Sequence, residues 1–494
     1  MAGICSYGGY VPRYRLNRKL IFDSMGWLNA GTASYAKGQK AVAGFDEDSL
    51  TMAVAAGRDC LKGMDRSGVE GIFFASTTMP FKERLNSGII LAALGLSEHI
   101  RAADFGGGLK ASTTALLSAL EGVASKGVNN MLVLASDCRL GKPASPQEMI
   151  FGDGAAAFLV GDRNVIAEFK GFYSTSYDFV DHFRGAFSKF DSQWEDRWIR
   201  DFGFEFIIPE TVKGFLDKYS LRIDAFSKVI YPCHYGGERR KLNKTLGITP
   251  EMDQPNLLET IGDTGTAQSL VMLVHAMEAG KPGDKILVLG FGNGCDALYF
   301  QLTENGASKG HHKGITGHLA DGKDLDKYNK YLMWRGIIPA DMGMRAEEDL
   351  WTRWSYNWRM RKAIYGLFGS KCRNCGTVQF PPQRICVNPD CGSVDEMEEF
   401  PLSDKRARIL SYTADNLTVS SDPPALSATL GFETGGKFQF DMTGCDLDDL
   451  YVGMPVEMAF RRRFYDAKRD ISTYFWKGIP VKGGKGSKEG KEGE

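Results

Sequence analysis

Asn130-Met-Leu-Val-Leu-Ala-Ser136 is a short apolar run that follows a stretch, Ala111 to Val123, in which apolar residues recur at helical spacing. About 155 positions later the same order returns, with a helical pattern from Ala267 to Met277 and then Lys285-Ile-Leu-Val-Leu-Gly290. A helix followed by a strand that is apolar on both faces is typical of a sheet covered by helices. We therefore predict an α/β fold built from two similar halves by internal duplication, although any two helix–strand units share some likeness.

The alternation of helices and strands ends near Gln301, where Gly, Ser, His and Lys replace the apolar period. With 494 residues, about two to four domains are expected. The predicted order is a first half at 1–165, a second half at 166–303, a linker and helical segment at 304–368, a zinc ribbon at 369–400, a β-barrel at 401–481 and a disordered tail at 482–494.

The charge balance excludes several classes of function. Lys and Arg number 60 and Asp and Glu 61, so the net charge is -1 and gives no basic excess for coating nucleic acid or an anionic membrane. No run approaches the length of about 18 apolar residues that a membrane-spanning helix needs, and the N-terminus lacks the pattern of a signal peptide. We expect a cytoplasmic chain whose thiols stay reduced or bind metal.

Four cysteines form the strongest motif in the chain. Two residues separate the first pair, ten residues follow, and four separate the second pair: Cys372, Cys375, Cys386 and Cys391. Each pair sits on a tight turn, so the four thiolates can close a tetrahedral shell around Zn²⁺ with no open position. Such a shell is structural rather than catalytic.

The alternating strands that follow, such as Val456-x-Met458-x-Phe460, are typical of a small barrel. A ribbon and barrel can bind single-stranded nucleic acid, but Arg461 to Arg463 is the one basic cluster here, so we do not expect that function.

Three segments resemble the archaeal type of 3-hydroxy-3-methylglutaryl-CoA (HMG-CoA) synthases and the thiolase superfamily to which those enzymes belong. They are Gly3-Ile-Cys-Ser-Tyr-Gly-Gly-Tyr-Val-Pro-Arg-Tyr-Arg-Leu16, Lys40-Ala-Val-Ala-Gly-Phe-Asp-Glu-Asp-Ser-Leu-Thr-Met-Ala53 and Phe151-Gly-Asp-Gly-Ala-Ala-Ala157. The resemblance implies a five-layered thiolase-like fold for 1–303. Residues 325–481 resemble the acyl-CoA-associated domain in which a zinc ribbon precedes an OB-fold barrel, here fused to the first part.

The same resemblance places the family's nucleophilic cysteine on Leu109, in Phe105-Gly-Gly-Gly-Leu-Lys-Ala-Ser-Thr-Thr-Ala115. Leucine cannot carry an acyl group, and no cysteine lies between Cys60 and Cys138. The family's acid/base glutamate falls near Thr77 and its histidine on Pro232, two residues before His234. We therefore do not expect the family's covalent thioester mechanism.

Aldol or retro-aldol chemistry on a β-hydroxyacyl-CoA needs no nucleophile, only a base and donors that hold an enolate. His234 and Asp263, where the family has an asparagine, are the polar candidates, with Tyr235 and Thr77 as donors. His234 can equally be an ordinary loop histidine, and Asp263 can be a cap for the helix that follows it. Cys233 and Cys295 would be nucleophiles only if loops brought them to the site, and packing is the simpler role for both.

Two sets of residues are candidates for binding the CoA thioester. Gly292, Asn293 and Gly294 follow a predicted strand and can present N–H groups to a thioester oxygen. Arg239 and Lys244 follow the His234 loop and can meet CoA phosphates, or they can lie on a solvated helix face.

The competing hypothesis is a non-catalytic subunit. Losing several catalytic positions together fits a thiolase-like scaffold that supports an active thiolase or synthase. In either case we expect acyl-CoA as the small-molecule partner and a homodimer, or a heteromer with a thiolase-like subunit.

Overall fold

A computed structural model describes residues 2–307, 312–344 and 353–481. The chain divides into two compact units, Met1–Ile337 and Ile338–Glu494. This division lies inside the segment 304–368. Strand β12 (Lys323–Asp324) pairs with β2 (Tyr14–Asn17), and α11 (Tyr328–Trp334) packs three buried aromatic rings against the first unit. Apolar burial therefore assigns the front of that segment to the first unit. The predicted tail 482–494 lies outside the described residues.

The first unit contains a nine-stranded mixed sheet in the order β5-β4-β6-β7-β1-β8-β11-β10-β9. Only two residue pairs, at Gly3 and Ile4, join β1 to β8. The sheet therefore falls into two halves at this point. Its strands are β1 (Gly3–Tyr10), β4 (Gly71–Ala75), β5 (Arg101–Phe105), β6 (Met131–Asp137), β7 (Gly154–Gly161), β8 (Ala167–Ser176), β9 (Lys228–Ile230), β10 (Lys285–Phe291) and β11 (Gly294–Leu302).

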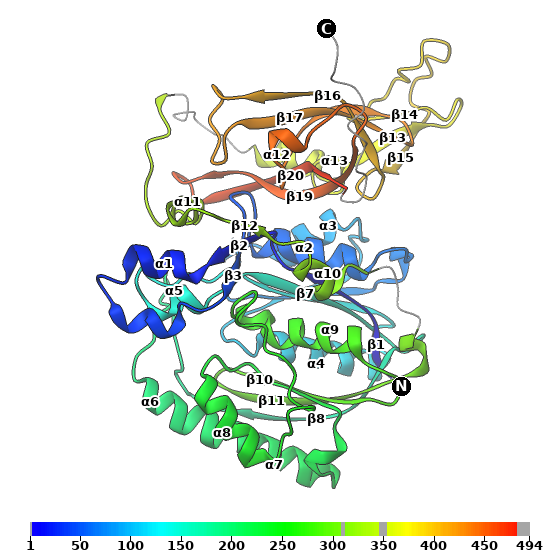
Figure 1. Cartoon of the computed structure of the whole chain (residues 1–494). Coiled ribbons are helices and arrows are strands. Elements are labelled where there is room, and N and C mark those ends of the chain that lie inside the picture. Colours follow the sequence, from blue (N-terminus) through cyan, green and yellow to red (C-terminus); the bar gives the residue numbers. More distant parts are fainter. Residues whose placement is uncertain (1, 308–311, 345–352, 482–494) are drawn as a thin grey trace, which may run out of the picture. The chain divides into compact units, whose positions relative to one another are not determined.

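Helices cover both halves and fill the space between them, giving five layers (Figure 1). The central layer holds α4 (Ala111–Ala124) and α9 (Gln268–Ala279), which pack in one hydrophobic cluster with strands of both halves. Outer helices are α2 (Ser49–Cys60) and α3 (Asn86–Ala93) on the first half, and α7 (Ile208–Tyr219) and α8 (Gly236–Leu246) on the second. Helix α10 (Gly314–Leu319) packs against β1 and α9. Smaller elements are α1 (Arg18–Met25), β3 (Gln39–Val42), α5 (Pro146–Ile150), α6 (Asp196–Trp198) and a π-helix at Ile199–Ile207.

The two predicted helix–strand units are α4 with β6 and α9 with β10. Both helices are buried along most of their length, in agreement with the single charged residue that each carries, Glu121 and Glu278. The predicted α/β fold with a duplicated unit is thus confirmed.

The second unit combines a three-stranded ribbon with a five-stranded barrel. The ribbon strands are β13 (Phe368–Cys372), β14 (Val378–Gln379) and β15 (Met397–Pro401), preceded by α12 (Trp354–Arg359) and α13 (Arg361–Ile364). The barrel order is β18-β17-β16-β19-β20, from β16 (Ala407–Asp415), β17 (Ala425–Phe432), β18 (Lys437–Asp441), β19 (Pro455–Asp466) and β20 (Ile471–Pro480). A bridge between Met442 and Gly478 closes it. Val456, Met458 and Phe460 are buried as predicted, but Ala459 and Arg461 of the same strand are buried too, so the alternation stops at Met458.

No helix in the described ranges has the length and apolarity needed to cross a membrane.

Candidate functional site

A cavity of about 50 Å³ lies beside Leu109 in the first unit. Its wall is partly apolar, with Leu109, Phe151, Ile199, Phe204, Pro232 and Phe291 among the lining residues. The remaining wall contains an unusual number of ionisable side chains: Arg139, Asp181, His182, Cys233, His234 and Asp263. The cavity is large enough for a few water molecules or a small acyl group.

Leu109 is fixed by both central helices. Its carbonyl accepts a hydrogen bond from Thr266 Oγ1 at 2.9 Å, just before α9. Gly292 faces it so closely that an added Cβ would lie 2.9 Å from Leu109 Cβ, and the φ of Gly292 is +154°. Only glycine fits this turn, so the β10–β11 hairpin defines one wall at Leu109.

The predicted thioester donors, Gly292 to Gly294, lie in the same hairpin. The Gly292 N–H donates to the Gly294 carbonyl at 3.0 Å, so this donor is already used within the turn. The Asn293 side chain donates to the Phe179 carbonyl at 3.0 Å. The Gly292 bond stays within the turn, and the Asn293 side chain anchors the loop after β8.

Asp263 and His234 both lie in the cavity wall. His234 Nδ1 is 3.9 Å from Asp263 Oδ2, and Arg139 Nη2 is 3.0 Å from the same oxygen. The other oxygen, Oδ1, accepts the Gly265 N–H at 2.9 Å. Asp263 therefore fulfils both predicted roles in geometry: one oxygen caps the turn before α9, and the other faces His234.

The surroundings fix the charge of these groups. Burial opposes ionisation of Asp263, but Arg139, His234 and the Gly265 N–H outweigh it and hold the pKa of Asp263 below its ordinary value. For His234, burial is the largest influence, and Arg139 adds to it, so the pKa of the ring lies below its ordinary value despite Asp263. His234 is thus a neutral imidazole at neutral pH beside an ionised carboxylate.

Thr77 and Tyr235 do not line the cavity. The Thr77 hydroxyl donates to Asp137 Oδ2 at 2.9 Å and its N–H to Oδ1 at 2.7 Å. The Tyr235 hydroxyl accepts from Gln193 Nε2 at 2.6 Å, and its ring packs on His234 with centroids 4.1 Å apart. Tyr235 therefore packs against the ring of His234 outside the cavity lining, whereas Thr77 belongs to a loop that is held by hydrogen bonds to Asp137.

The two predicted phosphate contacts on α8 differ. Arg239 is buried, and its guanidinium bonds to the Asp253 carboxylate and to the carbonyls of Tyr231 and Gln254. These bonds use its donors, which leaves it unsuited to hold a CoA phosphate. Lys244 is exposed on the same helix.

The cysteines near the site are not activated. Cys233 lines the cavity, but burial raises the pKa of its thiol to about 12, and its Sγ donates to the Tyr235 carbonyl. Cys295 is fully buried away from the cavity wall, and burial raises the pKa of its thiol as well. Protonated thiols are poor nucleophiles, in agreement with a packing role.

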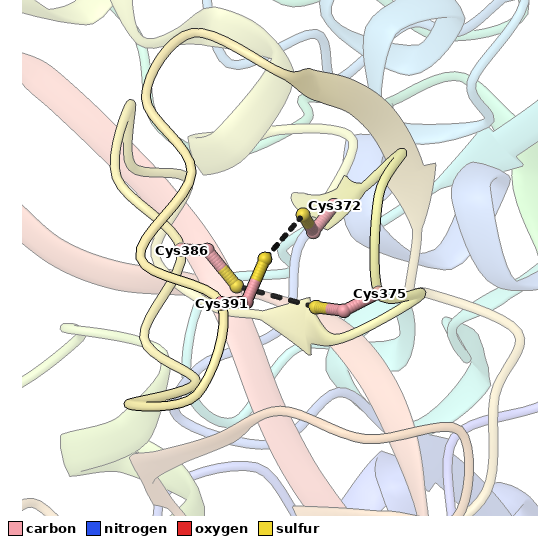
Figure 2. Close-up of side chains that lie close together, drawn as sticks. All are labelled: Cys372, Cys375, Cys386 and Cys391. Atoms are coloured by element: carbon pink, nitrogen blue, oxygen red, sulfur yellow. Dashed lines mark hydrogen bonds between the residues drawn. The ribbon is translucent and has the colours of Figure 1, made fainter.

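The predicted zinc ligands converge in the second unit (Figure 2). Their four sulfur atoms all lie within 4.8 Å of one another, with Cys372 Sγ and Cys391 Sγ 3.8 Å apart and Cys375 Sγ and Cys386 Sγ 3.5 Å apart. Four sulfurs at about 2.3 Å from a tetrahedral Zn²⁺ are separated by roughly 3.8 Å. Gly376 and Gly392, both at positive φ, shape the turns after the second and fourth ligands. The donor set and spacing fit a structural zinc ion.

Three ionisable residues of the site were not foreseen from the sequence: Arg139, Asp181 and His182. Arg139 follows β6 by two residues, where the carboxyl end of a buried strand is a usual place for functional groups. Asp181-His182 follows β8 in a loop without apolar period. The sequence shows that both segments directly follow a strand, but it does not show which of these loops lies next to Leu109.

Comparison with known proteins agrees with this architecture. A family model for the ChsH2 rubredoxin-like zinc ribbon domain matches residues 361–398. A hydroxymethylglutaryl-CoA synthase of Aeropyrum pernix is 32% identical over 350 residues, covering 70% of this chain and 93% of that protein. One of Caldivirga maquilingensis is 29% identical over 342 residues, covering 68% and 98%.

Solved structures show the same fold for the first unit. An HMG-CoA synthase complexed with CoA superposes with a TM-score of 0.60 at 16% identity, covering 70% of this chain and 92% of that one. The 3-oxoacyl-(acyl carrier protein) synthase III FabH of Pseudomonas aeruginosa gives 0.54 at 17% identity, covering 61% and 98%. The predicted thiolase-like fold is therefore confirmed. Since the Aeropyrum relative is matched over nearly its whole length, this chain belongs to the hydroxymethylglutaryl-CoA synthase family.

Proposed function

We propose that the chain makes or breaks a carbon–carbon bond next to a CoA thioester by aldol chemistry, without an acyl-cysteine intermediate. The observation that carries this proposal is the cavity at Leu109, whose wall contains His234 and Asp263 instead of a sealed apolar plug. The structural neighbour that is complexed with CoA supports an acyl-CoA as the ligand.

The site supplies a base for this reaction. In the cleavage direction, neutral His234 takes the proton of the β-hydroxyl group, the C–O bond becomes a carbonyl, and the Cα–Cβ bond breaks. Its electron pair leaves as the enolate of the shorter acyl-CoA. Asp263 stabilises the imidazolium that forms on His234, because its carboxylate stays ionised beside Arg139. Condensation is the same path in reverse.

The cavity does not support acyl transfer through a thiolate. Leu109 has no nucleophilic atom, and Cys233, the thiol in the wall, is held protonated by burial. An aldol step needs neither.

A non-catalytic subunit is the second candidate, and the position of Thr77 favours it. The hydroxyl that stands near the family's acid/base glutamate is fixed to Asp137 and does not line the cavity beside Leu109. On this alternative the first unit keeps its fold to support an active thiolase-like partner in a heteromer.

Incubating the purified full chain with a series of β-hydroxyacyl-CoAs and measuring free acyl-CoA by chromatography separates the two candidates. We expect release of acetyl- or propionyl-CoA together with a ketone or aldehyde, and its loss in Asp263→Ala and His234→Ala. Activity seen only with a co-purifying partner, and unchanged in both variants, would establish the scaffold instead. Size-exclusion chromatography with light scattering tests the homodimer or heteromer.

A further inference from the structure

We propose that His182, held by Asp181, is a second acid–base group of this cavity and delivers a proton to the enolate that His234 helps to release. This inference rests on the proposed aldol chemistry, and the test below separates the two.

The geometry places both histidines on one cavity. His182 and Asp181 line it from the loop between β8 and α6, while His234 lines it from the segment after β9. His182 Nδ1 lies 3.1 Å from Asp181 Oδ2, and the two side chains are only 15% and 11% exposed. An imidazole whose Nδ1 faces a carboxylate keeps Nε2 for a ligand.

The loop that carries His182 is well anchored. Phe183 and Ser192 exchange backbone hydrogen bonds at 2.9 and 2.8 Å, and Arg184 Nη1 lies 2.6 Å from Asp191 Oδ1. The Asn293 side chain binds the loop at the Phe179 carbonyl. His182 is therefore positioned by the same hairpin that packs against Leu109, as a group acting on substrate requires.

The surroundings give the two histidines opposite charge preferences. Burial and Arg139 disfavour a charged His182, but Asp181 and Asp191 outweigh them, so the pKa of His182 is raised. His234 is faced by Asp263, Arg139, Asp181 and Asp196, and burial dominates, so the pKa of His234 is lowered. Two titratable groups pushed apart in this way are the mark of a base and an acid in one site.

The Asp181 carboxylate can also accept a further hydrogen bond or stabilise a developing positive charge. Its Oδ1 is buried and has no hydrogen-bond partner among the described residues. A buried acceptor without a partner is unusual in a purely structural pair, because it costs free energy. A substrate hydroxyl or a water in the cavity would satisfy it.

The proton balance closes without any further reagent. His234 gains the β-hydroxyl proton as the Cα–Cβ bond breaks, and protonated His182 gives its Nε2 proton to the α-carbon of the enolate. The products are a neutral carbonyl compound and an acyl-CoA. His234 then loses one proton to water and His182 takes one up, which restores the starting state.

Acetoacetyl-CoA is a probe that does not depend on turnover, because its enolate absorbs ultraviolet light and forms by losing a proton to solvent. We expect the wild-type chain to bind it with an enolate-to-keto ratio raised at least tenfold over free solution at the same pH. His182→Gln and Asp181→Asn should lose most of this rise. The control His275→Gln, at a histidine paired with Gln254 outside the cavity, should retain it.

The pH profile gives the second readout. With a β-hydroxyacyl-CoA, kcat/KM should fall below the lowered pKa of His234 and above the raised pKa of His182, on either side of about 6.5. His182→Gln should remove the alkaline limb and leave the acid limb. If His182→Gln is folded by circular dichroism and both the enolate ratio and the alkaline limb match wild type, the role of His182 is refuted while the aldol proposal stands. An enolate signal that depends on His182 in a chain that cleaves no β-hydroxyacyl-CoA would instead refute the aldol reaction and keep the His182 site.

Discussion

Replacing Asp263 by asparagine tests the link between the carboxylate and the base. The substitution keeps the shape of the side chain and the oxygen that accepts the Gly265 N–H, while it removes the negative charge that faces His234. In the resting state His234 is neutral, so removing the charge of Asp263 changes its interaction energy little. In the transition state His234 becomes an imidazolium, and the variant no longer has a negative charge to stabilise it. We therefore expect kcat to fall more than KM rises.

The distance sets the size of this effect. Two unit charges 3.9 Å apart attract by about 4 kcal/mol at an effective dielectric constant of about 20 and by about 1 kcal/mol in water. Arg139, 3.0 Å from the same oxygen, cancels part of that field. A loss of about 1 to 4 kcal/mol corresponds to a decrease of roughly fivefold to a thousandfold in kcat.

The assay is acyl-CoA release from a β-hydroxyacyl-CoA, with Asp253→Asn as the matched control. Asp253 also pairs with a buried arginine, Arg239, but does not line the cavity. Both variants lose a carboxylate from an Arg–Asp pair, so they should lose similar stability, and only Asp263→Asn should lose activity. A folded Asp263→Asn chain with wild-type kcat would refute the assignment of Asp263 as the partner of the base.

Three further expectations follow from the contacts of the described residues. Arg139→Met leaves buried carboxylates uncompensated and should lower the free energy of unfolding by about 3 to 5 kcal/mol in urea titration at pH 7. That loss should shrink in acid, since the stability that Asp263 contributes is present above its unfolded pKa near 3.8 and disappears as pH falls through its lower folded value. Elemental analysis should find one Zn²⁺ per chain, and Cys375→Ser should lose it together with the cooperative unfolding of the second unit, whereas retained stoichiometry would contradict the four-cysteine site. Iodoacetamide at pH 7 should leave aldol activity intact, because the Cys233 thiol has a pKa of about 12; rapid inactivation that substrate prevents would point to a reactive thiol in the cavity.

The fold could be predicted because it depends on local patterns of apolar residues that are visible in a single sequence. The helix–strand units ending at Ser136 and Gly290 carry periodicity along their whole length, and the real strands end one residue later, at Asp137 and Phe291. Spacing alone also predicted the four zinc ligands, because two short knuckles constrain sulfurs that are close in sequence.

The site was harder to predict, since it is assembled from segments far apart in the chain. His234 and Asp263 were expected in the cavity and lie there. Thr77 was expected as a donor, but its hydroxyl is bound to Asp137, an acceptor 60 residues away. Arg239 was expected at CoA phosphates, yet Asp253 captures its guanidinium from the next loop. Such partners are set by tertiary packing and leave no periodic trace in the sequence.

His182 is a functional candidate that no sequence motif predicts. It becomes visible only when the loop after β8 is seen to return to Leu109, where Asn293 anchors it.

The most direct measurement of the central claim is an intact-protein mass spectrum of the full chain, quenched in acid during steady turnover of a β-hydroxyacyl-CoA. We predict that acyl-CoA and a carbonyl product accumulate while the protein mass stays that of the unmodified polypeptide, since Leu109 can hold no acyl group and Cys233 stays protonated. An acyl adduct that appears on the chain and disappears when substrate is exhausted would contradict it.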